Sequence, residues 1–171
     1  MAVISELGTD GKKMARVIEE EIELTIDAKP LHIIRKACEF FGSSLKGRQK
    51  GTAAVCGVTY KAPITFDPSI GLYFLPTHSP TNSNCSWISH SHIETIQPTA
   101  DNQTEIILKN KKRIIIHVSY GSMMNQVQRT AQYRYLMEAR MNQMRMMGNI
   151  VAENPSSALR ESMSPFYGLR E

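Results

Sequence analysis

The sequence predicts an α+β fold with an antiparallel β-rich core, one short N-terminal helix and a long C-terminal basic helix. Up to residue 118, most of the chain consists of short apolar segments separated by Gly, Pro, Asn and Ser, as in strands joined by turns. Residues 30–41 instead carry apolar side chains at helical spacing, and residues 122–147 contain no Gly or Pro. A chain of 171 residues can bury one sizeable core, so we expect a single domain at 1–148 and a flexible tail at 149–171.

The N-terminal part should contain strands after a loose start. We expect residues 1–11 to be loosely ordered and residues 14–26 to form one or two strands. In the second half of that segment apolar and acidic residues alternate, so one face should be buried and the other solvated. The apolar face comprises Ile22, Leu24 and Ile26, and the acidic face comprises Glu21 and Glu23. A second interpretation of the acidic run is a mimic that competes for a basic surface.

Residues 30–41 are predicted to form a helix. Asp27 can cap it, Pro30 fits its first turn and Gly42 supplies its end. Cys38 lies on the apolar face of this helix, where we expect a buried small side chain rather than a nucleophile.

Residues 40–51 are the segment on which the functional interpretation depends. Two phenylalanines lead into a stretch with three glycines, two serines and no acid, in which Lys46, Arg48 and Lys50 alternate with small or polar residues. Glycine lets a backbone approach another surface closely, and cations without acids create a positive field. We therefore predict a basic loop that can grip a phosphate backbone. A solvated flexible loop is the alternative.

The middle of the chain is predicted to be rich in strands. The expected strands are 52–60, 63–66, 72–75 and 86–96, followed by a hairpin of 104–108 and 113–118. Residues 77–85, rich in Thr, Ser, Asn and Pro, should form a surface loop. The hairpin turn at 109–112 contains three lysines, so its tip should be basic.

Residues 122–147 should form one long basic helix with a methionine-rich stripe. The stripe comprises Met123, Val127, Met137, Met141 and Met144. We expect it to pack against the core, and a self-association seam is the alternative because methionine packs adaptably.

Charge is distributed unevenly along a chain whose net charge is +4. Residues 1–28 contain three Lys or Arg and seven Asp or Glu. Residues 29–61 contain seven Lys or Arg against one acid, and residues 109–145 contain eight against one. Clustering of this kind is typical of a protein that binds a polyanion, most often nucleic acid.

The sequence also indicates the compartment. No apolar run approaches the roughly 20 residues that span a bilayer, and the N-terminus lacks the pattern of a secretory signal. Cys38, Cys56 and Cys85 form no Cys-x-x-Cys pair, which favours reduced thiols over a disulfide framework. We expect a cytoplasmic protein with no membrane partner.

Enzymatic signals are weak. His78, Cys85, His90 and His92 could be imagined as a zinc set, but their spacing matches none of the usual structural zinc sites. The sequence contains no P-loop, no dinucleotide-binding glycine motif and no clustered carboxylates of the kind a two-metal nuclease needs. We therefore predict a protein that is not an enzyme and that has no cofactor and no metal site.

Several short motifs occur in order between residues 29 and 131. They are Lys-Pro-Leu at 29–31, Phe-Phe-Gly-Ser-Ser at 40–44, Gly-Arg at 47–48, Asp-Pro-Ser at 67–69, Phe-Leu-Pro-Thr at 74–77, Cys-Ser-Trp-Ile-Ser-His-Ser-His at 85–92 and Asn-Gln-Val-Gln-Arg-Thr-Ala at 125–131. Together they resemble the ComK family of competence transcription factors from Gram-positive bacteria, whereas the acidic start and residues 149–171 depart from the family pattern.

This resemblance implies a nucleoid-associated activator of DNA-uptake genes. Members of the family bind paired AT-rich boxes of double-stranded DNA, largely through the minor groove, as dimers that assemble further. An adaptor hands them to a Clp-type protease. Two alternatives stay open from the residues themselves: an RNA or single-stranded nucleic-acid-binding protein, and a basic protein-interaction adaptor.

Three groups of residues are the predicted DNA contacts. Minor-groove proteins use Arg, Lys, Asn and Gln to read A·T-rich sequences, because a narrow groove attracts cations. The groups are Lys46, Arg48, Gln49 and Lys50 in the basic loop; Lys111, Lys112 and Arg113 at the hairpin tip; and Asn125, Gln126 and Arg129 at the start of the long helix. We expect Arg48 to enter the groove, Lys46 and Lys50 to hold phosphates, Arg129 with Gln126 to support a second contact, and the hairpin tip to add phosphate contacts.

Overall fold

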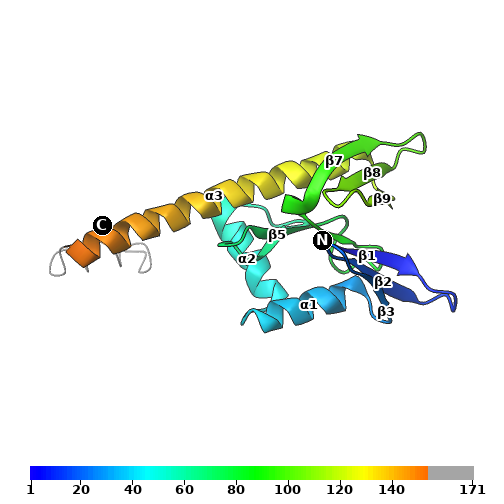
Figure 1. Ribbon diagram of the computed structural model, residues 1–171, viewed down its shortest axis with the longest axis horizontal. Coiled ribbons are helices and arrows are strands. Elements are labelled where there is room, and N and C mark those ends of the chain that lie inside the picture. Colours follow the sequence, from blue (N-terminus) through cyan, green and yellow to red (C-terminus); the bar gives the residue numbers. More distant parts are fainter. Residues whose placement is uncertain (154–171) are drawn as a thin grey trace. The chain divides into compact units, whose positions relative to one another are not determined.

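The strands form two antiparallel sheets, and helices pack against them (Figure 1). The computed structural model describes the backbone of residues 1–153 and the side chains of residues 1–146. The larger sheet has the strand order β3-β2-β1-β6-β5-β4, and the smaller sheet has the order β7-β8-β9. The strands are β1 Ala2–Leu7, β2 Lys13–Ile18, β3 Glu23–Ile26, β4 Ile64–Asp67, β5 Leu72–Pro76, β6 Trp87–Ser89, β7 Ile93–Pro98, β8 Thr104–Leu108 and β9 Arg113–Ile116. The helices are α1 Pro30–Phe40, α2 Leu45–Cys56 and α3 Tyr120–Glu153. The predicted α+β class is confirmed.

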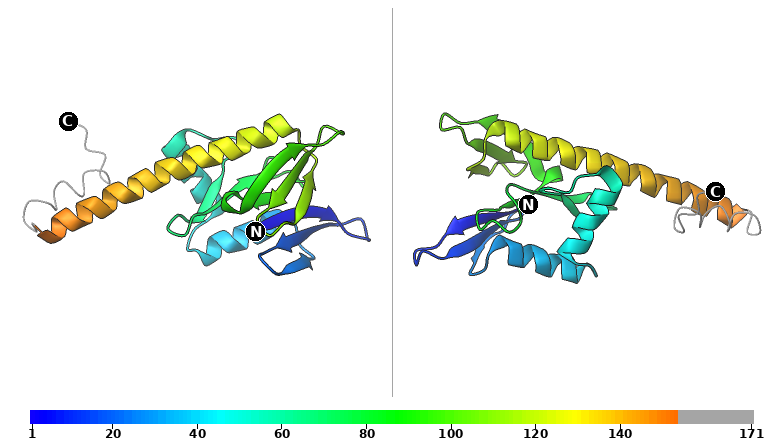
Figure 2. Two further views of the ribbon diagram at one scale, coloured as in Figure 1. Left: turned by 45° about the horizontal axis from the view of Figure 1, so that its top comes forward. Right: turned by 180° about the vertical axis from the view of Figure 1, so that it is seen from behind.

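The larger sheet carries a hydrophobic core on each of its faces. Successive strand residues point to opposite faces, so Ile4 and Ile88 join one core while Val3 and Trp87 join the other. The first core is completed by the smaller sheet and by Met123 of α3, and the second by α1 and the start of α2. Figure 2 shows α1 and the smaller sheet on opposite sides of the larger sheet.

The chain divides into two compact units, Met1–Arg134 and Tyr135–Glu171, and α3 contributes to both. In the first unit Met123 of the predicted methionine stripe is buried, as expected for core packing. In the second unit Met144 is exposed. The predicted tail begins inside α3, which continues to Glu153, and residues 154–171 lie outside the described part of the chain. A single domain at 1–148 stays a prediction.

The prediction of a loose start was wrong. Residues 2–7 form β1, which lies inside the larger sheet between β2 and β6. It pairs with β2 from Ala2 opposite Ile18 to Leu7 opposite Lys13. The turn between these strands needs Gly11, whose φ is +77°. A short apolar run near a chain end shows no periodicity of its own, and its pairing with β2 on one side and with distant β6 on the other makes it an interior strand.

Two strands form within the predicted 14–26 segment, but the predicted burial of the second was wrong. Ile22 precedes β3 and is 55% exposed, and Leu24 within β3 is 42% exposed. Alternation specifies two faces but not whether a layer covers either of them. Because β3 is the edge strand of the larger sheet, its apolar side chains join neither core cluster.

The predicted basic loop and the strand expected at 52–60 were also wrong, because residues 45–56 form α2. The Ser44 side chain caps the helix and Gly57, at φ +74°, ends it. Glycine and β-branched residues lower helix propensity, which explains the error. Contacts outside the segment favour the helix instead: Leu45 is buried, and the Thr52 hydroxyl donates to the Pro63 carbonyl at 2.6 Å.

The remaining helices and strands lie close to their predicted positions, except that one predicted strand is divided in two. The helix predicted at 30–41 is α1, and the predicted hairpin is β8–β9. Asp27 does not cap α1, because the N-cap position is Lys29, which makes no side-chain cap hydrogen bond. The strand expected at 86–96 is divided by a 3-10 turn at His90–His92, which carries the chain from β6 in the larger sheet to β7 in the smaller one.

Candidate nucleic-acid interface

The first candidate surface is the corner where α1 ends and α2 begins, which we call the α1–α2 corner and define as residues 35–50 (Figure 1). Gly42 adopts φ +66° and lets the chain leave α1. The Ser43 N–H closes that end by donating to the Cys38 carbonyl at 2.9 Å. The Ser44 side chain then accepts from the Gly47 N–H at 3.0 Å and opens α2. Two hydrogen-bonded helix ends therefore hold the corner in one conformation.

Cations predominate on this corner. Arg35, Lys36, Lys46 and Lys50 are exposed. The acid among them is Glu39, which bonds Lys36 at 2.8 Å. Lys46 and Lys50 are four residues apart and so share one side of α2, and no carboxylate of residues 1–146 lies within 4 Å of either amine.

A pocket of about 360 Å³ lies at the corner. It is lined by residues of both helices, including Arg35, Lys46 and Gln49, and by Pro80 and Thr81 of the 77–85 loop. The structure therefore brings Lys46, Gln49 and Lys50 of the predicted set onto one short helix that adjoins a pocket.

Arg48 is held differently from its neighbours. Its guanidinium donates to the carbonyls of Thr65 and Phe66 in β4 and, at 3.2 Å, to the Phe41 carbonyl at the end of α1. It also lies over the Phe66 ring, 5.6 Å from the centroid. The side chain thus ties α2 to the sheet and to α1. Entry of Arg48 into a DNA groove stays a prediction, and it would require these bonds to break.

The three predicted contact residues of the hairpin tip are paired with acids. Lys111 contacts Glu94 at 2.5 Å and Lys112 contacts Glu23 at 2.6 Å. Arg113 lies 3.4 Å from Glu105. The Lys112 amine and, after it, Arg16 hold the pKa of Glu23 below its usual range. Exposed pairs of this kind contribute little to stability, so phosphate oxygens could replace the carboxylates at small cost.

The predicted residues of α3 do not share a face. Asn125 is exposed and Arg129 is half-buried, whereas Gln126 is 4% exposed. Its side-chain amide donates to the Pro76 carbonyl at 2.7 Å and to the Lys61 carbonyl at 3.0 Å. Gln126 therefore holds α3 against the end of β5 rather than facing a ligand.

A helical pattern could have revealed the role of Gln126. It stands three residues from Met123 and four from Thr130, and both of these are buried. A glutamine at that spacing belongs to the buried stripe. The predicted contacts thus fall into separate groups, since the start of α2 joins the core on one face of the larger sheet, and the hairpin with the start of α3 joins the core on the other face.

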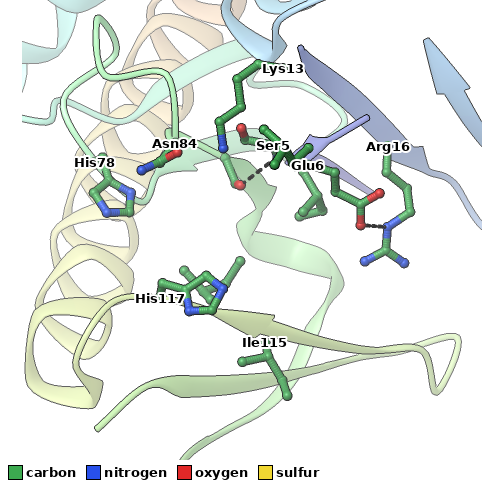
Figure 3. A pocket seen from close by; sticks show the side chains of 12 residues that line it. Ser5, Glu6, Lys13, Arg16, His78, Asn84, Ile115 and His117 are labelled. Atoms are coloured by element: carbon green, nitrogen blue, oxygen red, sulfur yellow. Dashed lines mark hydrogen bonds and ion pairs between the residues drawn. The ribbon is translucent and has the colours of Figure 1, made fainter. Parts of the chain in front are cut away.

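A second pocket, of about 490 Å³, lies between β1 and the end of β9 (Figure 3). Lys13, His78 and His117 line it, but Arg16 in its wall is neutralised by Glu6 at 2.6 Å and by Glu23. Burial, and then the nearby charges of Lys61 and His117, lowers the pKa of His78, so this ring is neutral at pH 7. Its mixed charge makes the pocket a weaker candidate for a polyanion than the α1–α2 corner.

The residues considered as a zinc set make other contacts. The Cys85 thiol donates to the His78 carbonyl at 3.3 Å, and burial raises the pKa of Cys85 to about 11. His92 Nδ1 lies 2.8 Å from the Ser89 hydroxyl. Across the residues that the structure describes, no three His, Cys, Asp or Glu side chains are grouped so as to hold a metal ion. Within the same residues, no helix combines the length and apolar character needed to cross a membrane.

Comparisons with known proteins agree on one family. A family model described as ComK protein matches residues 1–142. A protein of Bacillus subtilis (strain 168) named Competence transcription factor is 41% identical over 125 residues, which are 73% of this chain and 65% of that relative. The match thus spans about 65% of the relative's length. No solved structure matches.

Proposed function

This chain belongs to the ComK protein family, and we propose that it regulates the transcription of competence genes by binding double-stranded DNA. The name of the Bacillus subtilis relative supports this function, as does the excess of Lys and Arg in residues 29–61. A family match alone indicates no contact surface, so the assignment of residues depends on the geometry of the chain.

The observation that carries the proposal is the arrangement of cations at the α1–α2 corner. Lys46 and Lys50 extend from one side of a short capped helix, and Arg35 and Lys36 lie on the neighbouring helix. Phosphate contacts from such residues supply most of the sequence-independent affinity for DNA. We assign Lys46 and Lys50 as phosphate contacts, and Gln49 as a neighbour that can reach base edges.

We further propose that the sites are AT-rich boxes read from the minor groove. A narrow A-tract groove concentrates negative potential, which favours a compact group of cations over a long helix laid in the major groove. Asn125 and Arg129 supply a second contact, and Lys111, Lys112 and Arg113 exchange their carboxylate partners for phosphates.

A protein that stacks single-stranded bases is less well supported. Such proteins present aromatic rings on an open strand face. The adjacent rings of Tyr73 and Phe74 on β5 are instead buried. A basic adaptor that binds an acidic protein is the other alternative, and the experiment below distinguishes it.

Self-association and proteolytic control complete the proposed regulation. The edge strand β3 leaves Leu24 exposed, with Ile22 just before it, which offers an apolar edge to a second copy. Delivery to a Clp-type protease by an adaptor is proposed from the family alone. The segment in which we expected the relevant differences, 149–171, lies largely outside the described residues.

Fluorescence anisotropy tests the proposal with two duplexes, one that carries two AT-rich boxes and one GC-rich control, and with a single-stranded competitor. We expect tight AT-selective binding that a minor-groove drug displaces. Lys46→Ala and Lys50→Ala should each reduce the slope of log K against log salt by about 0.9. Lys12→Ala removes another exposed lysine, which lies in the β1–β2 turn and pairs with Asp10 at 3.3 Å; it is the control and should leave the slope unchanged.

Three results would contradict the proposal. Equal weak binding to both duplexes would leave only a basic surface and favour a protein partner. Stronger binding of the single strand would favour the RNA or single-strand alternative. Unchanged salt slopes in both lysine variants would remove the α1–α2 corner from the interface.

A further inference from the structure

One apolar side chain stands out at the α1–α2 corner. Phe40, the last residue of α1, is 86% exposed, more than any other large apolar side chain among the residues described. Single exposed apolar residues are common and carry no conclusion by themselves. Phe40 differs because of what supports it and what surrounds it.

Four phenylalanine rings run from Phe40 into the core. Phe40 packs edge-on against Phe41 with ring centroids 5.3 Å apart, and Phe41 stacks on Phe66 at 5.7 Å. Phe66 in turn contacts Phe74 at 5.2 Å. Exposure falls along this column from 86% at Phe40 to 39% at Phe41, and the last two rings are buried.

The backbone beneath the column is also fixed. The Phe41 N–H donates to the Ala37 carbonyl at 3.1 Å, and the Arg48 guanidinium holds the Phe41 carbonyl. The outermost ring therefore stands on a rigid base that is continuous with the core. An aromatic side chain with such support can contact a ligand without changing its own position.

The exposed ring lies on the same corner as several cations. Lys36 stands one turn before Phe40 on the same side of α1. Arg35 and Lys46 line one pocket together with Glu39, whose charge is offset by Lys36. An exposed apolar tip on a corner where Lys and Arg predominate suits the surface of a duplex, in which stacked bases lie between two rows of phosphates.

We propose that Phe40 is a wedge that inserts between base pairs of the bound duplex and unstacks them. This inference rests on the proposed DNA-binding function and adds its mechanism. Minor-groove proteins commonly insert apolar side chains between base steps and kink the DNA. The TA steps of AT-rich boxes unstack at low cost, so the wedge would also contribute to the preference for such boxes.

The test uses the full chain and a duplex with two AT-rich boxes that carries 2-aminopurine at a TA step. Unstacking raises the fluorescence of this base, and dyes on the duplex ends report bending by energy transfer. We expect the wild type to raise the fluorescence and to shorten the end-to-end distance. Phe40→Ala should abolish both changes and weaken binding about tenfold, with the same salt slope because the phosphate contacts remain.

Two further variants keep the test specific. Phe40→Leu should retain much of the fluorescence change, since leucine also serves as a wedge. Ile70→Ala removes another highly exposed apolar side chain, in the β4–β5 turn, and should behave as wild type. The midpoint of thermal unfolding should change little in all three variants, because Phe40 and Ile70 are both highly exposed.

The outcomes separate this inference from the proposed function. If the wild type binds AT-rich DNA without unstacking it, or if Phe40→Ala unstacks it as well as the wild type does, the wedge is refuted and the function stands. If Phe40→Ala loses self-association alone, the ring contacts protein and the wedge is again refuted. If the wild type binds no duplex, both proposals fall.

Discussion

Replacing Arg48 distinguishes a side chain that holds the fold from one that reads DNA. Its guanidinium bonds the carbonyls of Thr65 and Phe66, and hydrogen bonds to charged groups contribute about 1.5–3 kcal/mol each. The third bond, to Phe41, is exposed and adds little. Arg48→Ala should therefore lower the free energy of unfolding by about 3 kcal/mol or more. For a chain of this size the midpoint of thermal unfolding should fall by about 10 °C.

Urea and thermal denaturation followed by circular dichroism measure this loss. Arg48→Lys should recover only part of it, because one amine cannot bond several carbonyls in the fork geometry of a guanidinium. Lys50→Ala is the matched control on the same helix, and it should leave stability unchanged while weakening DNA binding. If Arg48→Ala is as stable as the wild type but loses its preference for AT-rich DNA, Arg48 is a groove reader and the structural reasoning is refuted.

Substitutions at Gln126, Lys112 and Cys85 test three further side chains. Gln126→Leu should lower the free energy of unfolding by about 2 kcal/mol, because two main-chain carbonyls lose their donor. Asn125→Ala on the exposed face should leave it unchanged, and equal urea midpoints for the two would contradict the buried role of Gln126. Lys112→Ala should cost less than about 1 kcal/mol, because its pair with Glu23 is exposed; a larger loss in urea would show that this contact holds the hairpin to β3. Cys85, with its pKa raised by burial from 9.0 to about 11, stays protonated in the folded state while it ionises in the unfolded state. The free energy of unfolding should therefore fall as the pH rises from about 9 to 11. Cys85→Ala should make this fall smaller. If the free energy of unfolding depends on pH identically in both proteins, Cys85 does not have the raised pKa.

Local patterns in the sequence were sufficient for several elements. The apolar spacing of residues 30–41 predicted α1, and the absence of Gly and Pro after residue 122 predicted α3. Turn residues and alternation predicted the β8–β9 hairpin. In each case the determining neighbours lie within a few residues of one another along the chain. The clustering of charge likewise needed only the order of residues, and so did the resemblance to the family.

The sequence by itself therefore determined the fold class, most of the helices and the β8–β9 hairpin, and it predicted the clustering of Lys and Arg from which a polyanion partner is proposed. Only the tertiary structure decided where β1 lies, because its place depends on β6, which is far along the chain. It also decided that residues 45–56 are helical, since Thr52 bonds Pro63 and Arg48 bonds β4, and these contacts outweigh the weak helix propensity of glycine. The same long-range packing buried Gln126 and left Leu24 in water. Periodicity specifies which side chains share a face, but only the layers that meet in the folded chain specify which face is covered.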